Sequence, residues 1–226
     1  MSSSNVLRLG AYAGIAYVVL VMVGLIAGNL ASPAPLSIFR SASEAARIAA
    51  VATPQGVWIG LGIAVLSVPF FVVFAVRIWI ALRGAAHTGL LPTTVLIAAG
   101  VAATLYLASF AVAAALDASA GHGLDSQGAM VLSYLRGTMD MLSWPVLGLF
   151  LVAAGVAGVR DRSLPTWTAW AAVVVGVAAA AVAVAATSDL AQMVQLLPLL
   201  WIVATSIALV ARPGRAAQSS KVMIGA

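Results

Sequence analysis

The chain has 226 residues, of which 63% are hydrophobic and only 8% are charged, and its formal net charge is +5. A soluble domain carries about 25% charged residues, so this composition excludes a protein that covers its surface with polar groups in water. It predicts a protein that has lipid as its solvent. The chain has no cysteine, and His87 and His122 fall in different predicted loops, so we expect no disulfide, metal site or cofactor.

Six apolar runs without Asp, Glu, Lys or Arg divide the chain. Each run reaches or approaches the roughly 20 residues that an α-helix needs to cross about 30 Å of hydrocarbon. The predicted fold is therefore all-α, an integral membrane bundle of six transmembrane helices in a single domain over residues 1–211. The predicted helices cover approximately residues 8–30, 54–82, 92–116, 126–159, 165–187 and 190–211.

The segments outside these helices are short. The apolar run after Arg8 is longer than the roughly 7–15 residues of a signal-peptide core, so we expect a retained first helix. Residues 32–53 form a predicted outer loop, in which Ser41–Glu44 is typical of a capping box that begins a short interfacial helix. Thr53 and Pro54 then predict the start of the second helix. Residues 212–226 predict a disordered cytoplasmic tail.

The positive charges are unevenly divided between the two sides of the predicted bundle. Because basic residues mark the cytoplasmic side, both termini are expected in the cytoplasm and the protein in the cytoplasmic membrane. The Lys and Arg residues lie mainly at helix ends and do not form one basic face, which argues against nucleic-acid binding. The lipid bilayer is the expected partner. The outer side receives Arg40 and Arg47. The cytoplasmic side receives Arg8, Arg77, Arg83, Arg160, Arg162, Arg212, Arg215 and Lys221.

Glycines recur four residues apart in the first two predicted helices, a spacing that lets helices approach closely. We interpret these glycines as contacts inside the bundle, and a homo-oligomer interface is the alternative. The pairs are Gly10 and Gly14, Gly24 and Gly28, and Gly56 and Gly60.

Three prolines lie inside the even-numbered helices. Pro69, Pro145 and Pro198 each precede the arginine that closes their helix by 14 or 15 residues, or about 21 Å along the axis. A proline inside a helix removes a backbone hydrogen bond and bends the helix. The spacing predicts three kinks at one depth around a shared space, and the alternative is that the kinks only shape the packing.

Polar and aromatic side chains gather toward the outer side, whereas the inner half is nearly pure Ala, Val, Leu, Ile and Gly. This distribution argues against an ion channel, which needs polar groups along its whole length. It favours a pocket that binds a hydrophobic or amphipathic small molecule. Four-residue spacing places three of the residues on one stripe of the fourth helix. The predicted lining is Arg136, Asp140, Trp144, Tyr106, Trp58, Gln192 and Gln195.

Other interpretations stay open. Arg136 and Asp140 can form a purely structural ion pair, since they are one helical turn apart. The protein can also be an enzyme that acts on an isoprenoid or lipid, as integral-membrane terpene cyclases do. Asp140 or Asp117 would then donate a proton, and the aromatic rings would stabilise a cation. A third interpretation is a structural or regulatory partner of another membrane protein.

Three short motifs carry a resemblance. They are Arg8-Leu9-Gly10, Arg160-Asp161-Arg162 followed by Leu164-Pro165-Thr166-Trp167, and Leu197-Pro198-Leu199-Leu200-Trp201. In these motifs and in its layout the chain resembles an uncharacterised group of multi-helix membrane proteins. This group is common in high-GC actinobacterial genomes and is classed under domains of unknown function. The resemblance implies the fold and no activity.

Overall fold

The computed structural model describes residues 3–31, 54–83, 90–120, 125–182, 194 and 196–211. Over these ranges the regular structure is entirely α-helical, and the predicted all-α membrane bundle is confirmed. The predicted interfacial helix, the C-terminal tail and the first residues of the last helix lie outside the described residues. The described helices are α1 (Ser3–Ala31), α3 (Pro54–Arg83), α4 (Leu90–Ala120), α5 (Ser126–Asp161), α6 (Thr166–Val182) and α8 (Leu196–Ala211).

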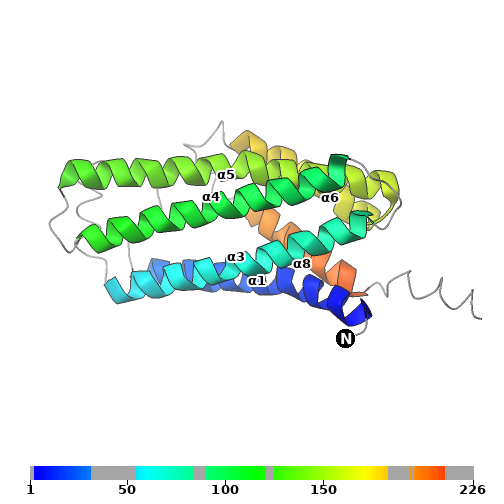
Figure 1. The fold of residues 1–226 in the computed structure, drawn as a ribbon, viewed down its shortest axis with the longest axis horizontal. Coiled ribbons are helices and arrows are strands. Elements are labelled where there is room, and N and C mark those ends of the chain that lie inside the picture. The colour runs from blue at the N-terminus through cyan, green and yellow to red at the C-terminus, as the bar shows by residue number, and fades with distance from the viewer. Residues whose placement is uncertain are drawn as a thin grey trace, which may run out of the picture.

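The described helices fall into two groups by length. The helices α1, α3, α4 and α5 are long and apolar enough to cross a membrane, whereas the described parts of α6 and α8 are shorter apolar helices. α1 packs mainly on α3, α4 on α5, and α5 on α6, while α8 contacts α1 and α6. The described parts of α6 and α8 accompany the long helices over only one half of the bundle (Figure 1).

Local sequence explains where the longest helix begins and ends. The Asp125 carboxylate accepts a hydrogen bond from the Gly128 backbone N–H at 2.8 Å, which satisfies one of the free donors of the first turn of α5. Arg162 has a left-handed backbone with φ 49°, which ends the helix and turns the chain toward α6. Pro165 follows, and its carbonyl oxygen accepts from Ala169 N at 3.0 Å.

Glycines bring the backbones of α5 and α6 into contact. A Cβ atom on Gly148 would lie 2.6 Å from the carbonyl oxygen of Gly176, and one on Gly176 would lie 2.7 Å from that of Gly148. Farther along, a Cβ on Gly155 would lie 2.6 Å from the Ala169 carbonyl oxygen. The two helices can therefore approach this closely only because Gly148, Gly155 and Gly176 carry no side chain.

The glycines of α1 also face the interior of the bundle. A Cβ on Gly10 would meet the Arg77 side chain of α3, and one on Gly14 would meet Ser206 of α8. One on Gly24 would lie 3.2 Å from the Gly60 carbonyl oxygen. For these described residues the small-residue spacing reflects packing within one chain.

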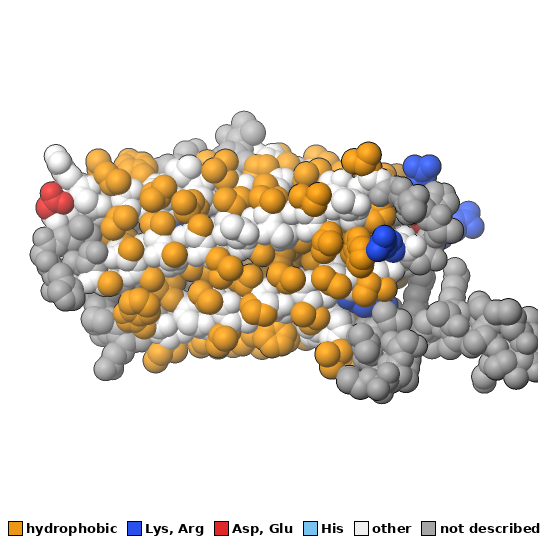
Figure 2. All heavy atoms as spheres, in the orientation of Figure 1, with side chains coloured by type: hydrophobic (Ala, Val, Ile, Leu, Met, Phe, Trp, Pro, Cys, Tyr) orange, Lys and Arg blue, Asp and Glu red, His pale blue; other side chains and the backbone are white. Residues whose placement is uncertain are grey.

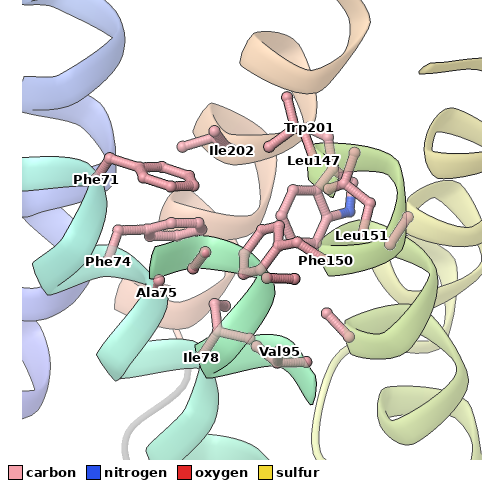
Figure 3. Packing of buried hydrophobic residues seen from close by; sticks show 14 of the residues in the cluster. Phe71, Phe74, Ala75, Ile78, Val95, Leu147, Phe150, Leu151, Trp201 and Ile202 are labelled. Carbon is pink, nitrogen blue, oxygen red and sulfur yellow. The ribbon is translucent and has the colours of Figure 1, made fainter. Parts of the chain in front are cut away.

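Five aromatic side chains form a continuous cluster, which we call the aromatic layer. It consists of Tyr17, Phe71, Phe74, Phe150 and Trp201, all of which are buried. The ring centroids of Tyr17 and Phe71 are 5.2 Å apart, and those of Phe71 and Phe150 are 5.8 Å apart. Trp201 stands edge-on to both Phe74 and Phe150 at 6.2 Å (Figure 3). The layer therefore joins α1, α3, α5 and α8 at one level.

The aromatic layer also shows how the charged ends align. Arg8, Arg83 and Arg160 each lie nine or ten residues along their helix from a layer residue, or about 14 to 15 Å. These arginines, with Arg162, define what we call the arginine end, and Asp125 defines the opposite, Asp125 end. Figure 2 shows the basic side chains gathered at one end of an apolar surface and an acidic side chain at the other.

The three prolines share a depth but not a common space. Pro69 and Pro145 lie inside α3 and α5, and Pro198 is the third residue of the described part of α8. Each precedes a residue of the aromatic layer by three to five positions. Pro69 is exposed, however, whereas Pro198 is buried. The predicted shared space is therefore wrong, because the aromatic rings fill the centre of the bundle and Pro69 is turned to its surface.

Candidate functional site

One acidic side chain lies well inside a membrane-spanning helix among the side chains that the structure describes. Asp125 and Asp161 stand at the two ends of α5, whereas Asp140 lies ten residues before Phe150 of the aromatic layer. That distance is about 15 Å along the helix, toward the Asp125 end. Asp140 is half-buried, as is Arg136 one turn away, and the two side chains interact electrostatically.

The Trp144 side chain lies one turn farther along α5 and is buried. Its indole N–H faces the Asp140 carboxylate, but the geometry does not complete a hydrogen bond. Nε1 is consequently buried with no partner in the part of the chain that is described. The indole N–H therefore has the Asp140 carboxylate as its neighbouring acceptor, at a geometry that leaves the hydrogen bond incomplete.

Hydroxyl groups of α4 and α5 lie near Asp140. Tyr106 of α4 is close enough to Ser143 for a hydrogen bond and to Asp140 and Tyr17 for an electrostatic interaction. The Ser143 hydroxyl itself donates to the Asp140 carbonyl oxygen at 2.6 Å. Tyr106 of α4 and Ser143 of α5 therefore lie beside Asp140, and Tyr17 of α1 lies next to Tyr106.

An apolar wall adjoins this cluster. The Tyr106 ring stacks on Phe110 with a centroid distance of 6.3 Å. Tyr17 belongs to the aromatic layer, which closes the cluster toward the arginine end. The cluster therefore combines hydrogen-bonding groups and one carboxylate with adjacent aromatic rings.

Several predicted site residues are not part of this cluster. Trp58 lies on α3 with 49% of its surface exposed, so its ring faces the surroundings of the bundle. Gln192 and Gln195 and the side chain of Asp117 lie outside the described residues. The structure thus brings together Arg136, Asp140, Trp144 and Tyr106 from the predicted lining.

Sequence reasoning missed residues on both sides of the aromatic layer. Tyr17 and Ser143 belong to the cluster, and the signal that could have found Tyr17 is a phenol inside an otherwise apolar run. Thr168, Thr205 and Ser206 are buried in the half that was expected to be almost purely aliphatic and glycine. Thr168 is partnered, since its hydroxyl donates to the Pro165 carbonyl oxygen at 2.8 Å.

Comparison with protein-family models, with curated proteins and with solved structures finds no match.

Proposed function

We propose that the protein binds an apolar or amphipathic small molecule taken from the bilayer. The site lies between the aromatic layer and the Asp125 end, with Asp140, Arg136, Tyr106 and Trp144 around the polar group of the ligand. The observation that carries the proposal is the buried Trp144 indole N–H, which faces the Asp140 carboxylate without completing a hydrogen bond to it. A hydrogen-bond acceptor on the ligand, such as a carbonyl or hydroxyl oxygen, would satisfy it.

The aromatic layer adds a second argument. The aromatic rings fill the bundle on the side of the Asp140 cluster that faces the arginine end. The rings in contact there are those of Tyr17, Phe71, Phe150 and Trp201. A continuous polar path, which transport of an ion would need, is interrupted there. Binding and retention of a ligand suit this arrangement better than passage through the protein.

The first prediction concerns the unpartnered indole. Trp144→Phe keeps an aromatic ring but removes the donor, so we expect about tenfold lower ligand occupancy from the loss of one buried hydrogen bond. The protein would be purified in mild detergent, and bound molecules would be extracted and quantified by mass spectrometry. Trp58→Phe is the matched control, because Trp58 is 49% exposed on α3 and is not part of the Asp140 cluster. Equal recovery of every extracted molecule from both variants would contradict the proposal.

The second prediction separates binding from a structural ion pair. Asp140→Asn should leave thermal stability in detergent nearly unchanged and lower ligand occupancy at least tenfold, roughly the loss of one charged hydrogen bond. Adding Arg136→Gln should not restore occupancy. If the pair is instead structural, Asp140→Asn lowers the unfolding temperature and the double variant recovers part of it, because an uncompensated charge has been removed.

The third prediction concerns orientation. We propose that the protein lies in the cytoplasmic membrane with the arginine end in the cytoplasm, since basic residues mark that side. Reporter fusions after Arg83 and Arg162 should then be active only as cytoplasmic reporters, and a fusion after Asp125 only as an external one. The opposite pattern at any of these three positions would overturn the orientation.

A further inference from the structure

We infer that the turn between α5 and α6 binds the headgroup of an anionic phospholipid. The turn lies at the arginine end, on the far side of the aromatic layer from the Asp140 cluster. The inference is therefore independent of the proposed ligand site. It rests on two arginines and two tryptophans that a short piece of chain places together.

The arginines come from the last turn of α5 and its C-cap. Arg160 and Arg162 are both exposed, and only Asp161 stands between them. The left-handed conformation of Arg162 ends the helix abruptly, so its side chain belongs to the turn and not to the helix surface. Guanidinium groups bind phosphate through two parallel hydrogen bonds, which makes arginine well suited to a phosphodiester headgroup.

The tryptophans place this turn at the membrane interface. Trp167 and Trp170 are three residues apart at the start of α6, so they share one face of the helix. They are 59% and 56% exposed, although both rings are large and apolar. Exposed indoles at the end of a membrane helix lie at the level of the lipid headgroups. The arginines a few residues before them therefore lie at the level of the phosphates.

Charge identifies the lipid class. The arginine end presents Arg8, Arg83, Arg160 and Arg162, whereas Asp161 is the one acid there among the described residues. The net charge of this end is therefore positive and favours an anion. The Arg83 guanidinium lies over the Trp79 ring, 4.6 Å from the ring centroid. One face of the guanidinium is therefore in contact with the ring. Arg160 and Arg162 are thus the pair best placed for a phosphate. Each basic residue near a membrane surface adds to the attraction for anionic lipid.

The test measures lipid enrichment. The full chain would be reconstituted in vesicles of phosphatidylcholine mixed with phosphatidylglycerol and extracted in mild detergent. The retained lipids would then be quantified by mass spectrometry. Phosphatidylglycerol should be enriched around the wild type, and Arg160→Gln with Arg162→Gln should reduce that enrichment about tenfold. Unfolding temperatures in pure phosphatidylcholine should be equal for the two proteins, which excludes a folding defect.

A matched variant distinguishes a site from a general attraction of charge. Arg212→Gln with Arg215→Gln removes the same charge from the chain after α8, and it should leave most of the enrichment intact. Equal losses in the two double variants would overturn the inference, as would unchanged enrichment in the Arg160 and Arg162 variant. Displacement of phosphatidylglycerol by inorganic phosphate, but not by chloride at equal ionic strength, would show that the turn binds free phosphate and would also overturn it.

Discussion

Gly148→Ala is expected to lower the free energy of unfolding by about 2 kcal/mol, the usual cost of forcing a methyl group into a filled interface. The new Cβ would lie 2.6 Å from the Gly176 carbonyl oxygen and 3.1 Å from the Ala180 backbone nitrogen. These are backbone atoms, so no side-chain rotation can relieve the contact. α5 and α6 would have to separate along their length, and the dispersion contacts between them would weaken.

A second glycine provides the control. A Cβ on Gly100 of α4 would meet no atom within 4 Å, so Gly100→Ala should stabilise the helix by roughly 0.5 to 1 kcal/mol through helix propensity alone. Both variants would be unfolded by titration with a denaturing detergent and followed by circular dichroism. If both substitutions shift the transition in the same direction, the close approach of α5 and α6 is contradicted.

Phe150→Ala should cost about 3 kcal/mol, near the lower limit for removing a buried aromatic ring from a protein core. Phe150 is fully buried and contacts both Phe71 and Trp201. We expect the lower limit because lipid is as apolar as the core, so the loss comes from packing and the cavity more than from transfer to water. The cavity would separate α5 from α3 and α8 at one point.

Phe70→Ala is the comparison for this prediction. Phe70 is adjacent to Phe71 in α3, but it is 39% exposed at the bundle surface. Its removal exchanges ring contacts with lipid for methyl contacts with lipid, so the unfolding transition should move by less than about 0.5 kcal/mol. A large effect at Phe70 together with a small one at Phe150 would mean that the aromatic layer is not the centre of the packing.

The all-α membrane bundle and the ends of the described helices α3 and α5 could be predicted because a membrane imposes a simple rule on the sequence. A charge inside the hydrocarbon is costly, so charges such as Arg83 and Arg160 accumulate where helices end. α3 and α5 accordingly end at Arg83 and Asp161, within two residues of the predicted positions. The same rule hides the rotation of each helix about its axis, since both the lipid face and the core face are apolar.

That missing rotation explains what sequence could and could not say of the candidate site. Arg136, Asp140 and Trp144 could be placed on one stripe because four-residue spacing fixes neighbours within a helix. The approach of Tyr17 and Tyr106 from other helices depends on how α1 and α4 are turned, and no periodicity in those apolar segments records it. The exposed position of Pro69 could not be predicted for the same reason.

Trp201 has a consequence for the order in which the protein is assembled. It contacts Phe74 and Phe150 and donates through Nε1 to the Thr168 carbonyl oxygen at 2.8 Å, so a single residue of α8 ties together α3, α5 and α6. During synthesis these three helices enter the membrane before α8 does. Until α8 arrives, the Phe74 and Phe150 rings and the Thr168 carbonyl lack these contacts with Trp201. The aromatic layer is therefore completed by α8, after insertion of α3, α5 and α6.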